Sequence, residues 1–247
     1  MPERATAERV ASSAAPDYDG RDLEAMSEAA RYHRDILRLF SPYLGERILE
    51  VGAGIGNISR LLLEREPARL HALEPSPRMF SLLSRRLRGV PNASAHHAFL
   101  SDVIDNRDVA GVDSVLSVNV LEHVEDDARE LEMMRHVLRS GGHLCLWVPA
   151  LPGLYSRFDR SLGHFRRYRK KDVAEKLEAA GFQVVRVAYR DLVGMVAWFV
   201  ACRLMGQALT PGKVRLYDRL VMPVTERFRH RIDPPVGKNV VAVARKV

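Results

Sequence analysis

The sequence predicts an α/β fold in which a mostly parallel sheet is covered by helices on both faces. Three observations support this prediction. Short aliphatic runs of strand length alternate along the chain with longer segments of helical periodicity. Short turns join these segments, as expected where helices connect parallel strands. A glycine-rich turn, Gly52-Ala53-Gly54-Ile55-Gly56, lies between the first aliphatic run after the N-terminal segment and the helical pattern that follows it.

The composition is that of an ordinary globular chain. Its 247 residues suffice for one domain with appendages, and 47% hydrophobic and 28% charged residues are usual for a soluble protein. The net charge of +7 indicates either an anionic partner or simply a basic surface. The two cysteines, Cys145 and Cys202, give no disulfide framework or metal-ligand spacing, and residues 1–15 contain no apolar signal segment. We therefore expect a cytoplasmic location and no metal site.

Residues 1–45 are predicted to form a tail followed by a helical cap. Apolar residues recur at helical spacing over residues 22–44, which include Tyr32. Amphipathicity shows only that one face is buried, so two interpretations remain open. The helix either covers a ligand site, with Tyr32 as a substrate contact, or it is an ordinary packing helix.

The glycine-rich turn follows a predicted buried strand at residues 47–51. Glycine is expected there because a tight strand-to-helix turn needs backbone angles and a closeness that a Cβ would prevent. The helix that begins near Ile58 directs free N–H groups and its positive dipole end at the turn, which is typical of a nucleotide-like ligand site. A dinucleotide-binding pattern would require glycine at position 57, where the chain has Asn57. A nicotinamide-dependent oxidoreductase is therefore disfavoured.

A second strand is predicted at residues 69–73 and ends at Glu74-Pro75. An acidic residue about 20 positions past a glycine turn can accept hydrogen bonds from both hydroxyls of a ribose. The alternative for Glu74 is a solvated turn carboxylate. A third strand, at residues 93–99, leads to Ser101 and Asp102, and Asp102 is also compatible with a simple turn cap.

The later part of the chain continues the alternation of strands and helices. A segment at residues 192–209 is nearly all apolar but contains Arg203 and Gln207, and it is marginal for a membrane span, which needs about 20 apolar residues. It is interpreted as a lid over the substrate, a peripheral membrane contact or a buried helix. Strands are predicted at residues 112–118, 143–148, 182–188 and 240–244, and helices at 125–138, 172–180 and 214–228.

The pattern Glu50-x-Gly52-x-Gly54-x-Gly56 resembles the first motif of class I S-adenosylmethionine-dependent methyltransferases. Further landmarks of that family follow in the expected order between residues 47 and 148, and the Leu-Glu-His-Val form of one of them looks like the small-molecule branch. These landmarks are Glu74, Asp102, Asn119-Val120-Leu121-Glu122-His123 and Arg139-Ser140-Gly141-Gly142.

The resemblance implies a seven-stranded Rossmann-like sheet whose last strand is antiparallel to the others. It implies S-adenosylmethionine as the cofactor and S-adenosylhomocysteine as the product, with Asp102 accepting a hydrogen bond from the adenine amino group. The chain would divide into an α/β core at 46–191, a helical lid or insertion at 192–235 and a final strand at 236–247. The expected cofactor-binding residues are Glu50, Gly52, Ala53, Gly54, Gly56, Asn57, Glu74, Pro75, Ser101, Asp102, Asn119 and Val120.

Residues 149–171 leave the carboxyl end of the fifth strand, where open α/β sheets bind their ligands. Arginine recognises carboxylate or phosphate groups, so this loop either contacts an anionic substrate or is a charged, solvated loop. It resembles a stretch of uncharacterised bacterial methyltransferases found beside glycosyltransferases, which suggests glycan, lipid-linked sugar or natural-product acceptors. The expected substrate contacts in the loop are Tyr155, Arg166, Arg167 and Tyr168.

Two histidines are candidates for acid–base chemistry. An oxygen acceptor needs a base within hydrogen-bond reach, and His164 is the first candidate and His123 the second. Quinone-biosynthetic relatives use a Glu-Glu-His arrangement linked to a divalent metal, and cyclopropane-forming relatives hold bicarbonate with a Glu-His pair. Here Asn119 occupies the first acidic position, and a structural role for His123 is equally compatible.

We therefore expect methyl transfer from S-adenosylmethionine to a small-molecule or lipid-linked acceptor, anionic in character. The donor is already activated, so the protein mainly positions both reactants and excludes water. A nucleic-acid methyltransferase is disfavoured, because the fourth-strand motif lacks the Asn/Asp-Pro-Pro-aromatic form and the chain shows no stacking platform. A non-catalytic cofactor-binding module stays open, as do the type of methylated atom and the oligomeric state.

Overall fold

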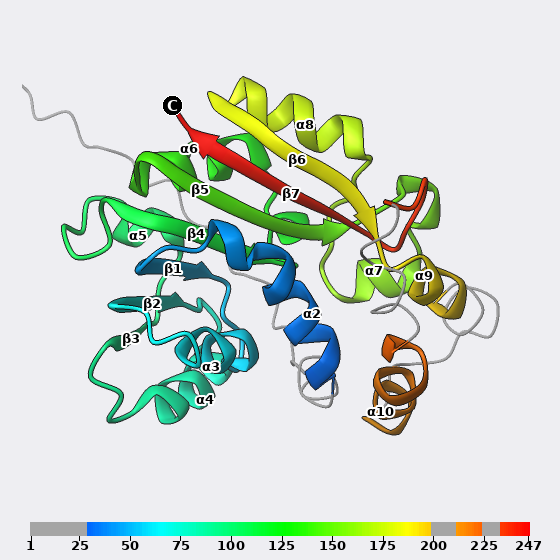
Figure 1. Ribbon diagram of the computed structural model, residues 1–247, viewed down its shortest axis with the longest axis horizontal. Coiled ribbons are helices and arrows are strands. Elements are labelled where there is room, and N and C mark those ends of the chain that lie inside the picture. Colours follow the sequence, from blue (N-terminus) through cyan, green and yellow to red (C-terminus); the bar gives the residue numbers. More distant parts are fainter. Residues whose placement is uncertain (1–28, 199–210, 224–232) are drawn as a thin grey trace, which may run out of the picture.

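The computed structural model describes residues 29–198, 211–223 and 233–247. A seven-stranded sheet with the order β3-β2-β1-β4-β5-β7-β6 forms its centre (Figure 1). The pairs among β1 to β5 are parallel, whereas β7 is antiparallel to both β5 and β6. The predicted fold class and the antiparallel last strand are confirmed. The strands are β1 (Arg47–Val51), β2 (Arg69–Leu73), β3 (Ala93–His96), β4 (Val112–Val118), β5 (Leu138–Pro149), β6 (Phe182–Arg190) and β7 (Asn239–Lys246).

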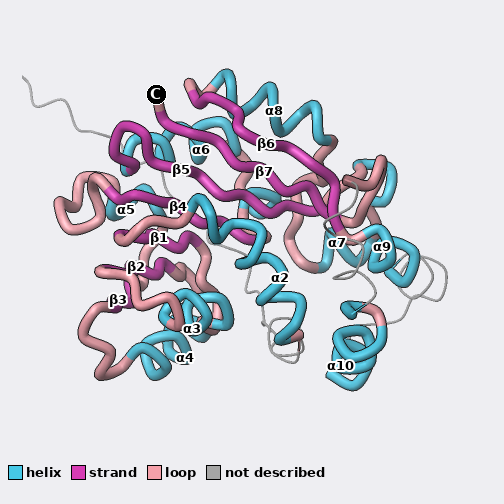
Figure 2. The backbone as a smooth tube through the Cα atoms, viewed as in Figure 1, coloured by secondary structure: helices cyan, strands magenta, loops and turns pink. Residues whose placement is uncertain are grey.

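Helices cover both faces of this sheet, as the tube drawing shows (Figure 2). The side chains of Ile48 and Leu49, which are neighbours in β1, point to opposite faces and belong to two separate buried clusters. α2 and α3 pack on the Ile48 side, and α6 and α8 pack on the Leu49 side. The helices are α2 (Ala30–Phe40), α3 (Asn57–Leu63), α4 (Pro77–Leu87), α5 (Leu100–Val103), α6 (Asp127–Val137), α7 (Arg157–Ser161), α8 (Lys170–Ala179), α9 (Leu192–Trp198) and α10 (Pro211–Leu220), with short 3-10 turns η1 (Ser41–Tyr43), η2 (Leu121–His123) and η3 (Pro152–Leu154).

Two strand boundaries differ from the prediction by three residues or more. β3 ends at His96 because α5 begins at Leu100, where Asp102 accepts a hydrogen bond from the Phe99 amide. β5 begins at Leu138 rather than 143, so Gly141 and Gly142 lie inside the strand, at a shift in its register against β4. A Cβ on Gly142 would come within 3.0 Å of two backbone oxygens, so these glycines permit an irregular strand rather than a turn.

The N-terminal and C-terminal helices are only partly covered by the described residues. The predicted helix at 22–44 contains α2, which is followed from Ser41 by the 3-10 turn η1, and residues 22–28 lie outside the described part. Of the apolar segment 192–209, the structure describes α9 alone. Among the described helices none has the length and hydropathy needed to cross a bilayer.

Candidate functional site

The predicted cofactor-binding segments meet at one edge of the sheet, where the parallel strands end. Backbone hydrogen bonds join the ends of adjacent strands. The amide of Ala53 donates to Leu73 O at 2.8 Å, and that of Glu74 donates to His96 O at 3.0 Å. β1, β2 and β4 are neighbours in the parallel sheet, so the residues that follow them lie side by side.

The turn after β1 can be built only with glycine at its critical positions. Gly52 has a φ of 70°, and a Cβ there would lie 2.4 Å from Val120 Cγ2, which follows β4. Gly56 has a φ of 84° and immediately precedes α3. The turn therefore keeps its backbone close to the end of β4, and a side chain at Gly52 would force the two apart.

Glu74 faces the glycine turn. Its Oε2 accepts a hydrogen bond from the amide of Gly54 at 2.7 Å, and its Oε1 accepts one from the amide of Ser76 at 2.8 Å. The residue is only 7% exposed, so the alternative of a solvated turn carboxylate is wrong. Burial raises the pKa of Glu74, and the two amides act in the opposite direction. Each carboxylate oxygen has a second lone pair, which fits acceptance from a ribose hydroxyl.

Glu50, in β1, contacts the helix that follows the glycine turn. It is 4% exposed, and its Oε2 accepts a hydrogen bond of 2.5 Å from Ser59 Oγ on α3. Burial raises the pKa of Glu50 to about 8, and the Ser59 hydroxyl lowers it less than burial raises it. The side chain thus ties β1 to α3, and it is protonated at neutral pH. Direct contact between Glu50 and the cofactor stays a prediction.

The remaining predicted cofactor residues border the same edge. Asp102 caps α5 through the Phe99 amide, which was the alternative to a contact with adenine. Asn57 Oδ1 accepts a hydrogen bond from Arg86. Asn119, directly after β4, is exposed and has a φ of 54°, a conformation that asparagine tolerates better than most residues. The cofactor roles of these side chains stay predictions.

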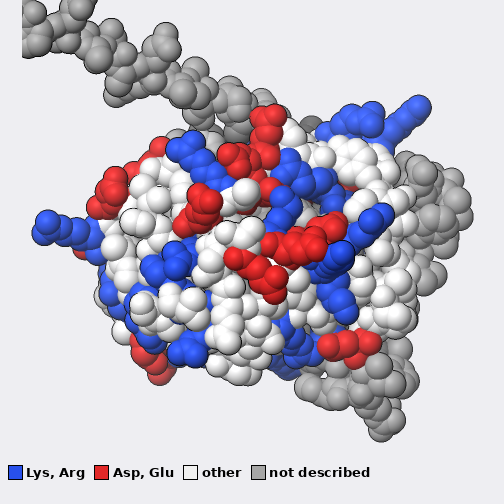
Figure 3. All heavy atoms as spheres, turned by 90° about the horizontal axis from the view of Figure 1, so that it is seen from above, with Lys and Arg blue, Asp and Glu red and all other residues white. Residues whose placement is uncertain are grey.

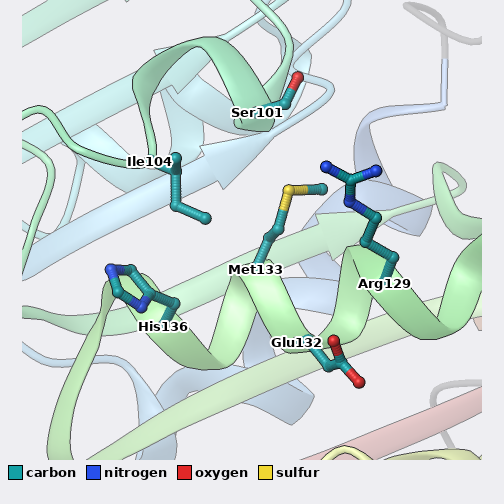
Figure 4. Close-up of a pocket in the computed structure, with 6 residues that line it drawn as sticks. All are labelled: Ser101, Ile104, Arg129, Glu132, Met133 and His136. Atoms are coloured by element: carbon teal, nitrogen blue, oxygen red, sulfur yellow. The ribbon is translucent and has the colours of Figure 1, made fainter. Parts of the chain in front are cut away.

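A surface pocket of about 310 Å³ opens between α5 and α6. Met133 and Ile104 point toward the space between the helices, whereas Glu132 points away (Figure 4). The pocket adjoins Ser101, so it places Met133 of α6 and Ile104, which follows α5, beside the segment expected to bind adenine. Sequence reasoning missed them because neither residue belongs to a motif. The lining residues are Ser101, Ile104, Arg129, Glu132, Met133 and His136.

Two of the predicted substrate contacts in loop 149–171 are buried against protein groups. Arg167 Nε donates to Asp159 Oδ1 at 2.7 Å, and the residue is 6% exposed. Tyr168 is 2% exposed, and its hydroxyl lies 3.0 Å from both Leu121 O and Asp127 Oδ2. These contacts correct the expectation that Arg167 and Tyr168 contact the substrate. The physical reason is that both side chains turn inward: Tyr168 fastens the loop to η2 and α6, and Arg167 ties Asp159 of α7 to the Ala150 carbonyl.

The other predicted substrate contacts keep different amounts of accessible surface. Arg166 forms an ion pair with Asp127 at 2.9 Å, and its side chain is 30% exposed. The Tyr155 hydroxyl donates to His164 O at 2.7 Å. The Tyr32 hydroxyl accepts a hydrogen bond of 3.0 Å from Trp147 Nε1 on β5, so Tyr32 packs within the core. Its substrate role stays a prediction.

Tyr32 also links α2 to α10. Its backbone amide donates to Asp218 Oδ1 at 2.9 Å, and the amide of Arg31 donates to the other oxygen of the same carboxylate at 3.1 Å. Both amides lie in the first turn of α2, where N–H groups have no partner within the helix. An acidic side chain from α10 therefore caps the predicted N-terminal cap helix.

The two candidate bases lie against each other. The rings of His123 and His164 meet edge to face, with centroids 4.6 Å apart and an interplanar angle of 85°. His164 Nδ1 lies 3.2 Å from Asp159 Oδ1. Partial burial and the neighbouring His164 together lower the pKa of His123 to about 4, against the opposite effect of a backbone hydrogen bond with Gly163. His123 is therefore neutral at physiological pH. Part of the residue stays exposed.

Glu122 completes this group, and sequence reasoning had given it no role of its own. The residue is 1% exposed, and burial raises its pKa to about 8. Its backbone oxygen accepts from the amide of Phe165 at 2.7 Å, which draws the loop onto η2. One ligand atom from each of Glu122, His123 and His164 lies within 4.8 Å of the others. The available signal was the polar pair within an otherwise apolar motif after β4.

Backbone strain accumulates at this edge of the sheet. Asn119, Leu151 and Asp191 follow β4, β5 and β6, and each has a positive φ, of 54°, 61° and 61°. For residues other than glycine this conformation is unfavourable, and it persists only where the surroundings enforce it. Strain of this kind is concentrated at functional sites, which agrees with the position of the predicted site.

Comparison with known proteins finds a family that matches part of the chain. Residues 49–144 match a family whose description is methyltransferase domain. A tRNA N(3)-methylcytidine methyltransferase of Schizosaccharomyces pombe is 26% identical over 164 residues, which cover 56% of this chain and 64% of that relative. The matched regions span 53% to 64% of the curated relatives' own lengths.

Two solved structures show the same fold over almost the whole chain. One is a chain of a Haloferax volcanii complex that contains the Trm112 methyltransferase activator, with 17% identity, a TM-score of 0.65 and coverage of 93% of this chain and 95% of the other. The second is phosphoethanolamine N-methyltransferase 2 of Haemonchus contortus in complex with S-adenosyl-L-methionine. It has 14% identity, a TM-score of 0.62 and coverage of 96% and 60%.

Proposed function

Residues 49–144 form a methyltransferase domain, and from this premise we propose that the chain transfers the methyl group of S-adenosylmethionine to a small-molecule or lipid-linked acceptor. The observation that carries the proposal is the position of Glu74. A buried carboxylate at the end of β2 faces the amide of Gly54, so the acidic group and the glycine turn border one site. A carboxylate acceptor beside a closely approaching backbone suits a pair of ribose hydroxyls, which would donate to it.

Different residues would bind different parts of the cofactor. Gly52 lets the turn approach the ligand, Glu74 accepts from the ribose hydroxyls, and the segment around Asp102 borders the adenine. S-adenosylmethionine, when bound, supplies a methyl group on a cationic sulfur, which needs no further activation. The protein therefore contributes mainly orientation and exclusion of water. The histidine pair His123 and His164 is the candidate for removing a proton from the acceptor.

The small or lipid-linked acceptor is supported by the surface and by the loop. Arg166, two residues after His164 in the loop, is partly exposed and can attract an anionic group. On the face of the molecule that includes α8, acidic and basic side chains are interspersed rather than gathered in a basic stripe (Figure 3). A nucleic-acid partner usually requires such a stripe.

A second candidate acceptor is a tRNA, because one relative of 26% identity is a tRNA methyltransferase. The two candidates are separated by a transfer assay with radiolabelled S-adenosylmethionine. Total tRNA is compared in parallel with a panel of phosphorylated metabolites and lipid-linked sugars. Label in the tRNA fraction alone would reject the small-acceptor proposal, and label in one of the small acceptors would support it.

The first experiment is a thermal-shift titration with S-adenosylhomocysteine, with NADH as the parallel ligand. A ligand at 100 times its dissociation constant stabilises the native state by about 2.7 kcal/mol. We expect a shift with S-adenosylhomocysteine alone, and a weaker shift for Glu74→Ala. A shift with NADH alone, or no shift with either ligand, would reject the proposed function.

A further inference from the structure

We propose that Glu122, His123 and His164 form a binding site for a first-row divalent transition-metal ion such as Zn²⁺. One ligand atom from each residue lies within 4.8 Å of the other two. η2 presents Glu122 and His123 at the end of β4, and His164 approaches from the loop that follows α7. Ligand atoms bound about 2.0–2.2 Å from one ion lie up to roughly 4 Å apart, so small side-chain rotations bring the three together.

The carboxylate of Glu122 is the independent observation that indicates a ligand. The residue is 1% exposed, and neither of its oxygens has a hydrogen-bond partner on another described residue, so that only the backbone of Glu122 itself acts on the carboxyl group in this way. Buried polar groups are normally hydrogen-bonded, and burial without a partner is costly. A cation at the cluster would supply the missing partner.

The two histidines are held in orientations that suit metal binding. Asp159 Oδ1 lies 3.2 Å from His164 Nδ1, which leaves Nε2 of His164 for a ligand. Asp159 is itself fixed by Arg167 Nε at 2.7 Å. The Gly163 carbonyl accepts a hydrogen bond from His123. Metal-binding histidines generally donate their second N–H to a carboxylate or a backbone carbonyl, and both histidines here have such a partner.

The ligand set selects the class of metal. Two imidazoles and one carboxylate suit Zn²⁺ and other first-row ions, whereas Mg²⁺ and Ca²⁺ prefer oxygen ligands throughout. Three protein ligands leave a coordination position open. Occupation of that position by the acceptor rests on the proposed function, but the metal site itself does not. Histidines bound to an ion are not available as bases, so a bound ion and the base role of His123 and His164 exclude each other, and the metal titration decides between them.

The experiment measures metal binding directly. Protein purified without a histidine tag and freed of metal by a chelator is titrated with Co²⁺, followed by visible absorption, and then with Zn²⁺ in competition. We expect one bound equivalent in the unaltered chain. Glu122→Gln and His164→Gln should weaken binding by roughly tenfold or more, and Asp159→Asn by about 10- to 100-fold. His136→Ala, which removes an exposed histidine of α6 outside the cluster, should leave binding unchanged.

Each other outcome is decisive. No stoichiometric binding by the unaltered chain, or equal affinity in Glu122→Gln, overturns the metal site. S-adenosylhomocysteine binding is measured on the same samples. If the chain binds the metal but does not bind S-adenosylhomocysteine, the proposed function is rejected and the metal site is upheld. A variant that loses its native circular dichroism spectrum is not used. In that case the ligands are identified from X-ray absorption at the zinc edge of the unaltered chain. Two imidazoles and a carboxylate uphold the proposal, and any other ligand set overturns it.

Discussion

At the scale of single residues, Glu74 has a structural role and a predicted binding role. Replacement by alanine leaves the amides of Gly54 and Ser76 without their acceptor, and each buried unpaired donor costs about 1–3 kcal/mol. We expect Glu74→Ala to lower the affinity for S-adenosylhomocysteine by about tenfold or more, which corresponds to about 1.4 kcal/mol. Calorimetric titration measures the affinity, and urea unfolding measures the stability.

The matched control for this prediction is Glu64→Ala, which removes an exposed glutamate just after α3. It should change neither quantity by more than about 0.5 kcal/mol. If Glu74→Ala lowers stability but leaves the affinity unchanged, Glu74 is only a brace for the turn and does not bind the ribose.

Glu50 should make the stability of the protein depend on pH. Its pKa rises from 4.5 to about 8 on folding, because of burial. Between these values the native state keeps a proton that the unfolded state has released, so stability falls as pH rises, by up to about 1.4 kcal/mol per unit. Glu50→Gln cannot ionise and still accepts from Ser59, so we expect it to gain up to about 4 kcal/mol relative to the unaltered chain between pH 5 and pH 8.

Urea unfolding of both proteins at pH 5 and pH 8 tests this prediction. The quantity of interest is the stability difference between the two proteins, since other buried groups titrate equally in both. An unchanged difference at the two pH values would show that Glu50 is ionised in the native state.

At the scale of elements, the glycine turn and the segment after β4 depend on each other. A Cβ at Gly52 would lie 2.4 Å from Val120 Cγ2. An alanine there would also have to adopt the positive φ of 70° that the turn requires. We expect Gly52→Ala to cost about 1–2 kcal/mol for the backbone and about 1–3 kcal/mol for the collision, and to weaken S-adenosylhomocysteine binding. Gly89→Ala has the backbone cost alone, because its φ is 78° and no atom lies within 4 Å of its Cβ.

The double variant Gly52→Ala/Val120→Ala isolates the collision. Removal of the Val120 methyl groups leaves Val120 Cβ, at 3.5 Å, within ordinary van der Waals distance. Stability in urea should recover to about that of Gly89→Ala. If the double variant is no more stable than Gly52→Ala, the collision is not the cause of the loss.

Most elements could be predicted from periodicity, and the exceptions have identifiable causes. The sequence predicts all seven strands, because most of them are short apolar runs between turn residues; β3, with Ser94 and His96, is the more polar exception. The end of β3 was misplaced because α5 depends on a cap by Asp102, a contact with the Phe99 amide that the pattern does not reveal. The start of β5 was misplaced because paired glycines usually mark a turn, whereas here they allow a register shift within a strand.

At the scale of the whole molecule, the glycine turn and Glu74 could be predicted together because sequence spacing and strand ends fix them locally. The inward direction of Arg167 and Tyr168 could not, since it depends on Asp159 and on Asp127, which come from other elements. The approach of His164 to Glu122 has the same origin. It follows from how the loop after β5 folds back over η2, which no local pattern encodes.

The sheet also predicts that the matched domain is not an independent folding unit. β7 lies between β5 and β6, with seven residue pairs to β5 and eight to β6, and its first six residues are all buried. A chain shortened to end at residue 238 keeps every predicted cofactor-binding residue but exposes an apolar strand edge on β5. We expect it to show no cooperative urea transition and no S-adenosylhomocysteine binding. Removal of Val247 alone, which is 69% exposed and lies beyond β7, should change neither property. Cooperative unfolding and binding in the shortened chain would show instead that β1 to β5 suffice for the fold, with β7 added at its margin.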